Sequence, residues 1–295
     1  MKLKSSARSE DIREHMVPRR LAAALAICGA MIASDVSATV TTSIESFLVT
    51  RDGSTFFFDG FADGQVPPSS PSIPYSVGGT FNATDESGGK LQLNSAQGQA
   101  FQNASGQGRL SQSALLVTNT DSTNTTFGLK QNMTFGIYGL FDFGTLTAAR
   151  DNFGIAASDR VGASGNEQLQ VEIDRSVGGD LFLTLLRQDF ATNTLTTIGQ
   201  QLLDISLGDQ IVLGLEHAAN STDLFGGFAY VTNGTIGQTQ YLGSGSLFHG
   251  ETFVRTSFFA SQAVPEPGTL ALALAGLFGF LGSRRLTRNR AGLNA

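Results

Sequence analysis

The sequence of 295 residues has no tryptophan, a single cysteine and three histidines. Cys28 lies in an apolar N-terminal segment that we expect to be removed, so the mature protein is predicted to have no disulfide, thiol nucleophile or cysteine metal site. Without tryptophan, the chain lacks the largest of the aromatic platforms that sugar-cleaving enzymes use. His15 belongs to the same N-terminal region, and His217 and His249 stand apart without a ligand pattern, which predicts surface or loop positions for both.

Catalytic motifs are incomplete. No Gly-x-Ser-x-Gly elbow leads from a strand to a helix, and the glycine-rich residues 243–246 are predicted to form a flexible loop. Glu172 and Asp174 fill two positions of the Glu-x-Asp-x-Glu pattern that jelly-roll glucanases carry on one strand, but Ser176 stands in the third. Since a strand has a period of two, we expect Glu172 and Asp174 together on the solvated face of a half-buried strand. The sequence therefore predicts a protein that is not an enzyme; the alternative is a secreted carbohydrate-active enzyme with an atypical site.

The body of the chain is acidic. Residues 39–263 include 20 acidic and 9 basic side chains, a formal charge of −11. This charge excludes nucleic acid and anionic lipid as partners, because both are polyanions. Asp142, Asp151 and Asp159 are candidate oxygen ligands for a surface Ca²⁺, but they form no compact Asp-x-Asp-x-Asp string. We therefore expect no metal and no other cofactor.

Composition favours β structure in this body. Gly, Thr, Ser, Asn and Phe are abundant, and few segments carry an apolar stripe at helical spacing. Fourteen short strand candidates are separated by Gly, Asn and Asp turns: 44–49, 55–61, 75–81, 90–94, 114–119, 125–129, 133–143, 152–157, 168–175, 181–188, 194–200, 210–216, 224–232 and 252–260. They predict an all-β fold, a two-sheet jelly-roll sandwich, and residues 168–233 resemble the concanavalin-like lectin and glucanase sandwich in pattern.

Two polar stretches interrupt the strands. Residues 66–74 hold four of the seven prolines and predict a stiff, extended loop. Residues 94–112 are rich in Gln, Ser, Gly and Ala, which predicts either a long exposed loop or a polar edge strand around Ala100 and Phe101.

The N-terminus has the parts of a secretory signal peptide. Arg19 and Arg20 precede an apolar run over residues 21–33, and small residues follow up to Ala38. This order predicts a signal helix, cleavage between Ala38 and Thr39, and a signal peptide that spans residues 1–38. Translation from Met16 instead of the first methionine is an open alternative, because residues 1–15 are long and charged for the start of such a signal.

The C-terminal residues 264–295 combine three signals in a fixed order. A Pro-Glu-Pro triplet is followed by an uncharged apolar run over residues 268–282 and then by arginines: Pro265, Glu266, Pro267, Arg284, Arg285, Arg288 and Arg290. The run predicts a transmembrane helix of about 22 Å, short for a hydrocarbon core of about 30 Å. The arginines should remain in the cytoplasm and stop the helix, which places the body outside.

This tail resembles the PEP-CTERM sorting signal of Gram-negative bacteria. The resemblance implies an exported protein that is held briefly in the inner membrane, processed by an exosortase-type enzyme, and delivered to the cell surface or matrix. It further implies association with exopolysaccharide and biofilm. An uncut membrane anchor is the alternative, although such an anchor has no need of the triplet and is usually longer.

Overall fold

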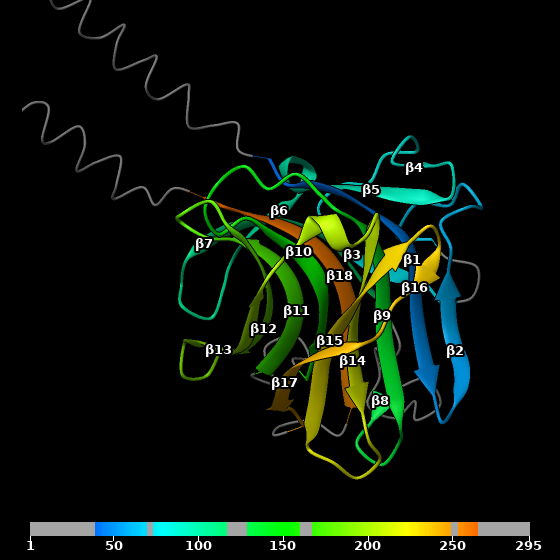
Figure 1. Ribbon diagram of the computed structural model, residues 1–295, viewed down its shortest axis with the longest axis vertical. Coiled ribbons are helices and arrows are strands. Elements are labelled where there is room, and N and C mark those ends of the chain that lie inside the picture. Colours follow the sequence, from blue (N-terminus) through cyan, green and yellow to red (C-terminus); the bar gives the residue numbers. More distant parts are fainter. Residues whose placement is uncertain (1–38, 70–72, 117–128, 160–166, 249–252, 265–295) are drawn as a thin grey trace, which may run out of the picture. The chain divides into compact units, whose positions relative to one another are not determined.

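The body of the protein is a sandwich of two antiparallel sheets (Figure 1). The computed structural model describes residues 39–69, 73–116, 129–159, 167–248 and 253–264. The prediction of an all-β, two-sheet sandwich is confirmed, because the helical turns among these residues are short: η1 (Ser95–Gln97) and η2 (Ile205–Leu207). Within the same residues no helix is long and apolar enough to cross a membrane. The predicted signal and transmembrane helices lie outside the described residues.

The first sheet pairs nine strands in the order β16–β15–β14–β9–β1–β5–β4, with β17 on β15 and β2 on β1. Their bounds are β1 (Thr41–Arg51), β2 (Ser54–Asp59), β4 (Glu86–Ser87), β5 (Lys90–Asn94), β9 (Phe135–Asp142), β14 (Gln210–His217), β15 (Asp223–Thr232), β16 (Thr235–Ile236) and β17 (Gln240–Ser246). Two of its hairpins turn on Asp52–Gly53 and Asn233–Gly234, where both residues of each turn have positive φ, as two-residue turns of twisted hairpins require.

The second sheet also pairs nine strands, in the order β13–β12–β11–β10–β18–β7–β3, with β6 on β7 and β8 on β18. Their bounds are β3 (Tyr75–Gly78), β6 (Gln99–Gln102), β7 (Gly108–Leu116), β8 (Leu129–Lys130), β10 (Asn152–Ser158), β11 (Glu167–Arg175), β12 (Leu181–Asp189), β13 (Thr194–Leu202) and β18 (Phe253–Ala263). The last strand, β18, therefore runs through the middle of this sheet, between β10 and β7.

Most strand predictions are confirmed to within a few residues, but the flexible loop at 243–246 is wrong. Those residues belong to β17 and pair with β15. Glycine is needed there for packing, since a Cβ on Gly245 would stand 2.6 Å from a methyl of Ile198. In the stretch 94–112, the structure bears out the polar edge strand, as β6, but residues 108–112 begin β7, which the candidate 114–119 placed six residues too late. The described part of 66–74 contains no strand, and the candidate 125–129 lies almost wholly outside the described residues.

Phenylalanine fills the space between the sheets. Phe47 and Phe57 of the first sheet meet Phe258 and Tyr75 of the second in edge-to-face contacts, with ring centroids 5.2 Å apart for Phe47–Phe258 and 5.7 Å apart for Phe57–Tyr75. These geometries are the favoured ones for aromatic pairs and add to the hydrophobic burial. A chain without tryptophan thus builds the aromatic part of its core mainly from phenylalanine, the most abundant aromatic residue that it has.

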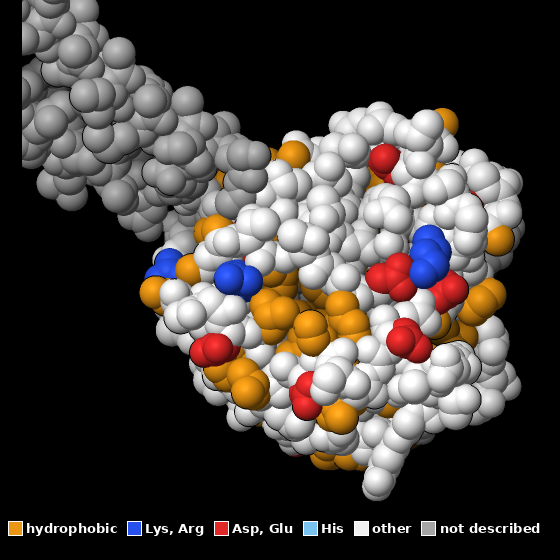
Figure 2. Space-filling model, turned by 45° about the horizontal axis from the view of Figure 1, so that its top comes forward, with side chains coloured by type: hydrophobic (Ala, Val, Ile, Leu, Met, Phe, Trp, Pro, Cys, Tyr) orange, Lys and Arg blue, Asp and Glu red, His pale blue; other side chains and the backbone are white. Residues whose placement is uncertain are grey.

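One side of the sandwich is closed by contact between the two edge strands β13 and β17. Gly199 of β13 makes this approach possible, because a Cβ there would lie 1.9 Å from the carbonyl oxygen of Leu242. On the surface, Figure 2 brings the top of the Figure 1 view forward and shows mostly uncharged atoms on that face. The few acidic and basic side chains form small groups there, and hydrophobic side chains form a patch near the centre of the view, with others around its edge.

Candidate binding cleft on the second sheet

The outer face of the second sheet is polar because of the alternation in β11. Leu169, Val171 and Ile173 are fully buried in the core, so the residues between them point outward. The prediction that Glu172 and Asp174 share one face is therefore confirmed. The prediction that this face is solvated is wrong for Glu172, which is only 4% exposed, while Asp174 is half-buried.

Neighbouring strands explain why Glu172 is covered. It stands opposite Thr184 of β12 and Gly154 of β10. Long carboxamide side chains flank it, since Gln170 precedes it on β11 and Asn152 of β10 stands opposite Asp174. Polar side chains of this length on both sides cover the Glu172 carboxyl and also supply hydrogen bonds to it.

A continuous hydrogen-bonded network crosses the floor of the cleft. Arg109 Nη2 donates to Asn152 Oδ1 at 2.6 Å, and Asn152 Nδ2 donates to Glu172 Oε2 at 2.8 Å. Gln170 Nε2 also donates to Glu172 Oε2. Gln188 Nε2 donates to Gln170 Oε1 at 2.8 Å. Because buried polar groups linked in this way polarise one another, the network holds its members in fixed orientations.

Both ends of the network are tied to the backbone. Arg109 also donates from Nε to Ser261 Oγ at 3.0 Å and from Nη1 to the carbonyl of Arg150 at 2.6 Å. At the other end, the backbone N–H of Ala104 donates to Gln188 Oε1 at 3.2 Å. The segment after β6 is thereby fastened across the second sheet, and it forms one wall of the cleft.

The acid groups of the cleft have raised pKa values. Burial raises the pKa of Glu172 to about 8, and the nearby charge of Asp174 adds to the rise against the opposing effects of Arg109 and the hydrogen bonds from Asn152 and Gln170. The Glu172 carboxyl is thus mainly neutral at pH 7. Burial also raises the pKa of Asp174, opposed by the hydrogen bond that Thr184 Oγ1 donates to it and by Arg109.

The cleft above this floor has a volume of about 710 Å³. Eight carboxamide side chains line it: Gln99, Asn103, Gln107, Asn152, Gln168, Gln170, Gln188 and Gln200. Three phenylalanines, Phe101, Phe182 and Phe259, add apolar surface, and Phe101 is 41% exposed. Carboxamides donate and accept at once, so they match hydroxyl groups, while phenyl rings match the apolar faces of sugar rings.

The three aspartates considered as candidate calcium ligands do not come together. Asp142 binds Lys90 at 2.8 Å, Asp151 accepts the backbone N–H of Ala148 at 2.7 Å, and Asp159 accepts that of Glu167 at 2.8 Å. Each aspartate has a local structural role on a different strand or turn. Over the described residues, no group of three or more His, Cys, Asp or Glu side chains is arranged to hold a metal ion.

The surface position predicted for His217 is wrong. Its side chain is 2% exposed and stacks on Phe135 with ring centroids 4.6 Å apart. Its Nδ1 lies 2.8 Å from the carbonyl oxygen of Met133 and its Nε2 lies 3.0 Å from that of Ser221. A ring fixed by two backbone carbonyls anchors the loop between β14 and β15 to the sheet. His249 lies outside the described residues.

The predicted sorting residues fall outside the described residues as well. This holds for Ala38 at the signal cleavage position, for the Pro-Glu-Pro triplet and for the four arginines. Thr39 is the first described residue, two positions before β1 begins. These residues stay predictions from the sequence.

Sequence reasoning missed the residues that make the cleft. Arg109, Asn152 and Gln188 lie on three different strands, and nothing in their spacing shows that β7, β10 and β12 bring them to one face. One signal was present in β11 itself, where Gln168, Gln170, Glu172 and Asp174 alternate with aliphatic residues. A row of long polar side chains on one face of a strand, without lysine, is typical of a polar cleft as well as of a solvated surface.

Fold and cleft together define a β-sandwich protein with an amide-rich cleft on one sheet, which Arg109, Arg150, Arg175, Glu172 and Asp174 also line. The C-terminus identifies how such a protein is sorted: the PEP-CTERM protein-sorting motif matches residues 263–285. The matched stretch includes the triplet and the first two arginines of the basic cluster. The resemblance seen in the sequence is thus confirmed, and the motif marks an exported protein that an exosortase sorts to the cell surface through a membrane-anchored precursor. No curated protein matches the chain.

Proposed function

We propose that this chain is a non-catalytic protein of the cell surface or extracellular matrix that binds exopolysaccharide in the cleft of the second sheet. The observation that carries the proposal is the lining of eight carboxamides and three phenylalanines in about 710 Å³, which is room for several sugar units. The hydroxyl groups of a polysaccharide can pair with these carboxamides and also with the arginine and carboxyl side chains that line the cleft. Export to the surface brings the cleft to where such polymers occur.

The state of the two carboxyl groups supports a role without catalysis. A glycosidase needs an acid and a base or nucleophile that both reach the scissile bond. Glu172 is buried and accepts from two carboxamides, and Asp174 accepts from Thr184. A carboxyl that is held in this way positions its neighbours, and Glu172, at 4% exposure, presents little surface to a ligand in the cleft.

We further propose that the sandwich belongs to the jelly-roll class of concanavalin-like lectins. Support comes from β18, which lies between β10 and β7, and from β1, which lies between β9 and β5. The first strand of the body is thus inside the first sheet and the last strand is inside the second, an arrangement that a simple meander does not produce.

A second candidate function is a carbohydrate-active enzyme with an atypical site. The observation that favours it is the pKa of Glu172 at about 8, because a carboxyl that is protonated at neutral pH is suited to general acid catalysis. Incubation of the mature protein with the purified matrix polysaccharide decides between the candidates. New reducing ends that are lost in a Glu172→Gln variant would establish the enzyme; binding without turnover supports the first proposal.

Binding in the cleft is tested with matched pairs of variants. Phe101→Ala removes an exposed ring from the lining, and its control Gln102→Ala changes the next residue of the same strand. Gln200→Ala and Gln201→Ala form a second pair, because adjacent residues of β13 point to opposite faces. We expect Phe101→Ala to weaken polysaccharide binding about three- to tenfold, the value of one aromatic contact. Equal binding by the members of both pairs would contradict the cleft as the site.

Sorting is tested at the triplet. Changing Pro265, Glu266 and Pro267 to alanine leaves the N-terminal signal untouched, so export should continue. If the triplet is what the processing enzyme grips, the full-length variant should remain in the inner membrane fraction. Fractionation with an antibody against the body measures this. Equal release of wild type and variant, with the tail removed from both, would show that recognition lies elsewhere in residues 263–285.

A further inference from the structure

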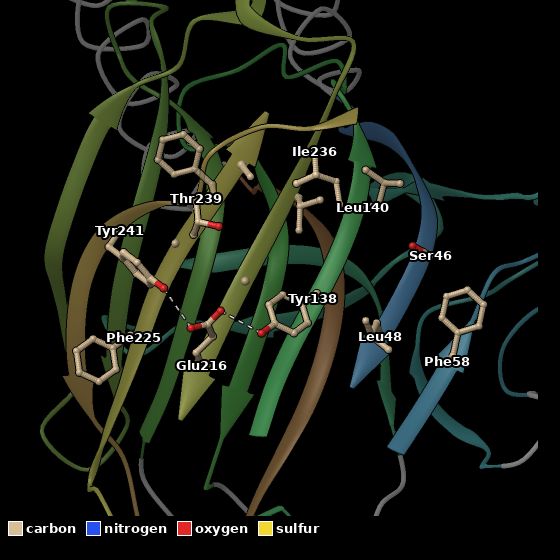
Figure 3. Close-up of a pocket in the computed structure, with 15 residues that line it drawn as sticks. Ser46, Leu48, Phe58, Tyr138, Leu140, Glu216, Phe225, Ile236, Thr239 and Tyr241 are labelled. Carbon is tan, nitrogen blue, oxygen red and sulfur yellow. Dashed lines mark hydrogen bonds between the residues drawn. The ribbon is translucent and has the colours of Figure 1, made fainter. Parts of the chain in front are cut away.

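The outer face of the first sheet carries a second groove, of about 330 Å³, which differs in chemistry from the cleft (Figure 3). We call it the tyrosine groove. Its walls are mostly apolar, with Leu48, Leu140, Ile236 and Phe58 around the side that Figure 3 shows toward β1 and β2. One acidic side chain, Glu216, projects into it from β14.

Register explains the shape of the groove. Tyr138 of β9, Gly214 of β14, Gly227 of β15 and Tyr241 of β17 stand opposite one another across four neighbouring strands. Two positions without side chains therefore separate two tyrosines. A Cβ on Gly214 would lie 3.1 Å from the ring of Tyr138, and one on Gly227 would lie 3.3 Å from the ring of Tyr241. Each tyrosine ring thus leans over a glycine, and its outer face stays open to the groove.

Glu216 joins the two tyrosines. It stands in the next row of the sheet, opposite Gly136 and Phe225. Tyr138 Oη donates to Glu216 Oε1 at 3.0 Å, and Tyr241 Oη donates to Glu216 Oε2 at 3.3 Å. Figure 3 shows both phenol groups directed at the carboxylate from opposite sides. The two rings are therefore held in place by one acid group.

The charge of Glu216 has no counter-ion from the groove. Among the described residues that line it, none is Lys or Arg. The two phenols are neutral donors, and they leave about two of the roughly four lone-pair sites of an ionised carboxylate unused. A carboxylate set among aromatic faces is the arrangement that attracts an organic cation, by charge and by cation–π interaction. The excess of acidic residues over the whole body adds attraction at longer range.

We propose that the tyrosine groove binds an ammonium-bearing sugar unit, with Glu216 as its counter-ion and the rings of Tyr138 and Tyr241 as the surface that the sugar ring covers. A pyranose has an apolar face that fits an aromatic ring, and the volume suits one or two such units. The cationic character follows from the groove itself. The choice of a sugar as the carrier of the ammonium group rests on the proposed function.

The test compares two probes with the same sugar backbone: a hexamer of β-1,4-linked glucosamine, which carries ammonium groups, and its fully N-acetylated counterpart, which carries uncharged acetamido groups instead. Their binding to the mature protein recovered from producing cells is measured by calorimetry at pH 6, where the amines are protonated. We expect the glucosamine hexamer to bind about tenfold more tightly, and the difference to shrink as salt is raised. Glu216→Gln should remove the difference, because it deletes the charge and keeps the shape. Asp180→Asn is the matched control, since it changes the net charge equally on an exposed turn of the second sheet.

Tyr241→Ala gives a second, independent variant. Its side chain is 61% exposed, so its removal spares the core, and it should weaken binding of both hexamers. Equal affinity of the two hexamers, or a Glu216→Gln protein that still prefers the charged one, would overturn the proposal. If Phe101→Ala abolishes glucosamine binding and Glu216→Gln does not, the sugar occupies the cleft, so the groove assignment fails and the proposed function stands. Binding of tetramethylammonium without either hexamer would overturn the sugar as carrier.

Discussion

The two outer faces of the sandwich each hold a glutamate, and the surroundings give the two residues different states. Glu172 on the second sheet is 4% exposed and lies in a network of carboxamides. Glu216 on the first sheet is half-buried, and two phenol groups donate to it. Burial raises the pKa of Glu172 more than its hydrogen bonds and Arg109 lower it, so the carboxyl is mainly neutral at pH 7 and belongs to a rigid floor. Contact with water leaves Glu216 available to a ligand. The comparison teaches that side-chain chemistry alone does not decide a residue's role; the length and polarity of its neighbours do.

The largest expected effect is the pH dependence that Glu172 brings. Its pKa is about 8 in the folded protein against 4.5 for an ordinary glutamate, so the folded state binds the proton more tightly than the unfolded state. The free energy of unfolding should therefore fall as pH rises from about 4.5 to about 8, by at most about 5 kcal/mol. Below this range the carboxyl is protonated in both states and the loss disappears.

The measurement is urea denaturation at pH 5 and at pH 9. Glu172→Gln should lose most of the fall between the two pH values, because an amide does not titrate. Glu216→Gln, the matched change on the first sheet, keeps Glu172 and should retain the fall. If stability depended on pH in the same way in wild type and Glu172→Gln, the pKa of Glu172 in the folded protein would be the same as in water, and the prediction would be wrong.

A cation on each sheet gives the next comparison. Arg109 on the second sheet is 6% exposed and donates four hydrogen bonds to three residues, Asn152, Ser261 and Arg150. Arg109→Leu should lower the free energy of unfolding by about 3–5 kcal/mol, since it leaves several buried acceptors unpaired at about 1–3 kcal/mol each. Lys90→Met removes the partly exposed ion pair with Asp142 on the first sheet and should cost at most about 1 kcal/mol. Similar losses in the two variants would contradict the rigid floor.

These contrasts show what the sequence was able to predict. The period of two in β11 fixes which residues face outward, so the shared face of Glu172 and Asp174 followed from the sequence alone. Burial of that face did not, because it depends on Asn152 and Thr184, which stand opposite Asp174 and Glu172 on neighbouring strands. The positions of strands follow from the local sequence pattern. Which side chains from different strands meet on one face of a sheet follows from the pairing register, which a single sequence does not reveal.

The tyrosine groove illustrates the same limit on the first sheet. Tyr138 and Tyr241 are separated by 103 positions in the sequence, and only the pairing of four strands places them in one row. The glycine-rich stretch after Tyr241 was predicted to be a flexible loop, since glycine usually disfavours strands. In the structure, glycines such as Gly245 make room for the core side chains of β11 and β13. The sorting tail, by contrast, was found from the sequence because its signals are contiguous.

A smaller effect is expected for a hydroxyl on the second sheet. Thr184 is 3% exposed, donates to Asp174 and accepts from Gln200 Nε2 at 3.2 Å. Thr184→Val keeps the shape and deletes the hydroxyl, so it should lower the free energy of unfolding by about 1–3 kcal/mol. Because the hydrogen bond from Thr184 lowers the pKa of Asp174, the variant should also raise that pKa, which carboxyl NMR titration measures. An unchanged Asp174 titration would contradict the role given to Thr184.

The smallest effect should come from deleting a hydroxyl on the first sheet. Tyr241 is 61% exposed and its hydrogen bond to Glu216 is 3.3 Å long, so water replaces it readily. Tyr241→Phe should change the free energy of unfolding by less than about 0.5 kcal/mol in thermal or urea denaturation. The ring remains to cover a ligand, and Tyr138 still orients the carboxylate. Affinity for the glucosamine hexamer should therefore stay within about threefold of wild type, while Tyr241→Ala loses the ring and falls further. A large loss of stability in Tyr241→Phe would show that the hydrogen bond from Tyr241 to Glu216 stabilises the folded state. The first sheet would then hold its glutamate as rigidly as the second sheet does, and the contrast between the two faces would be wrong.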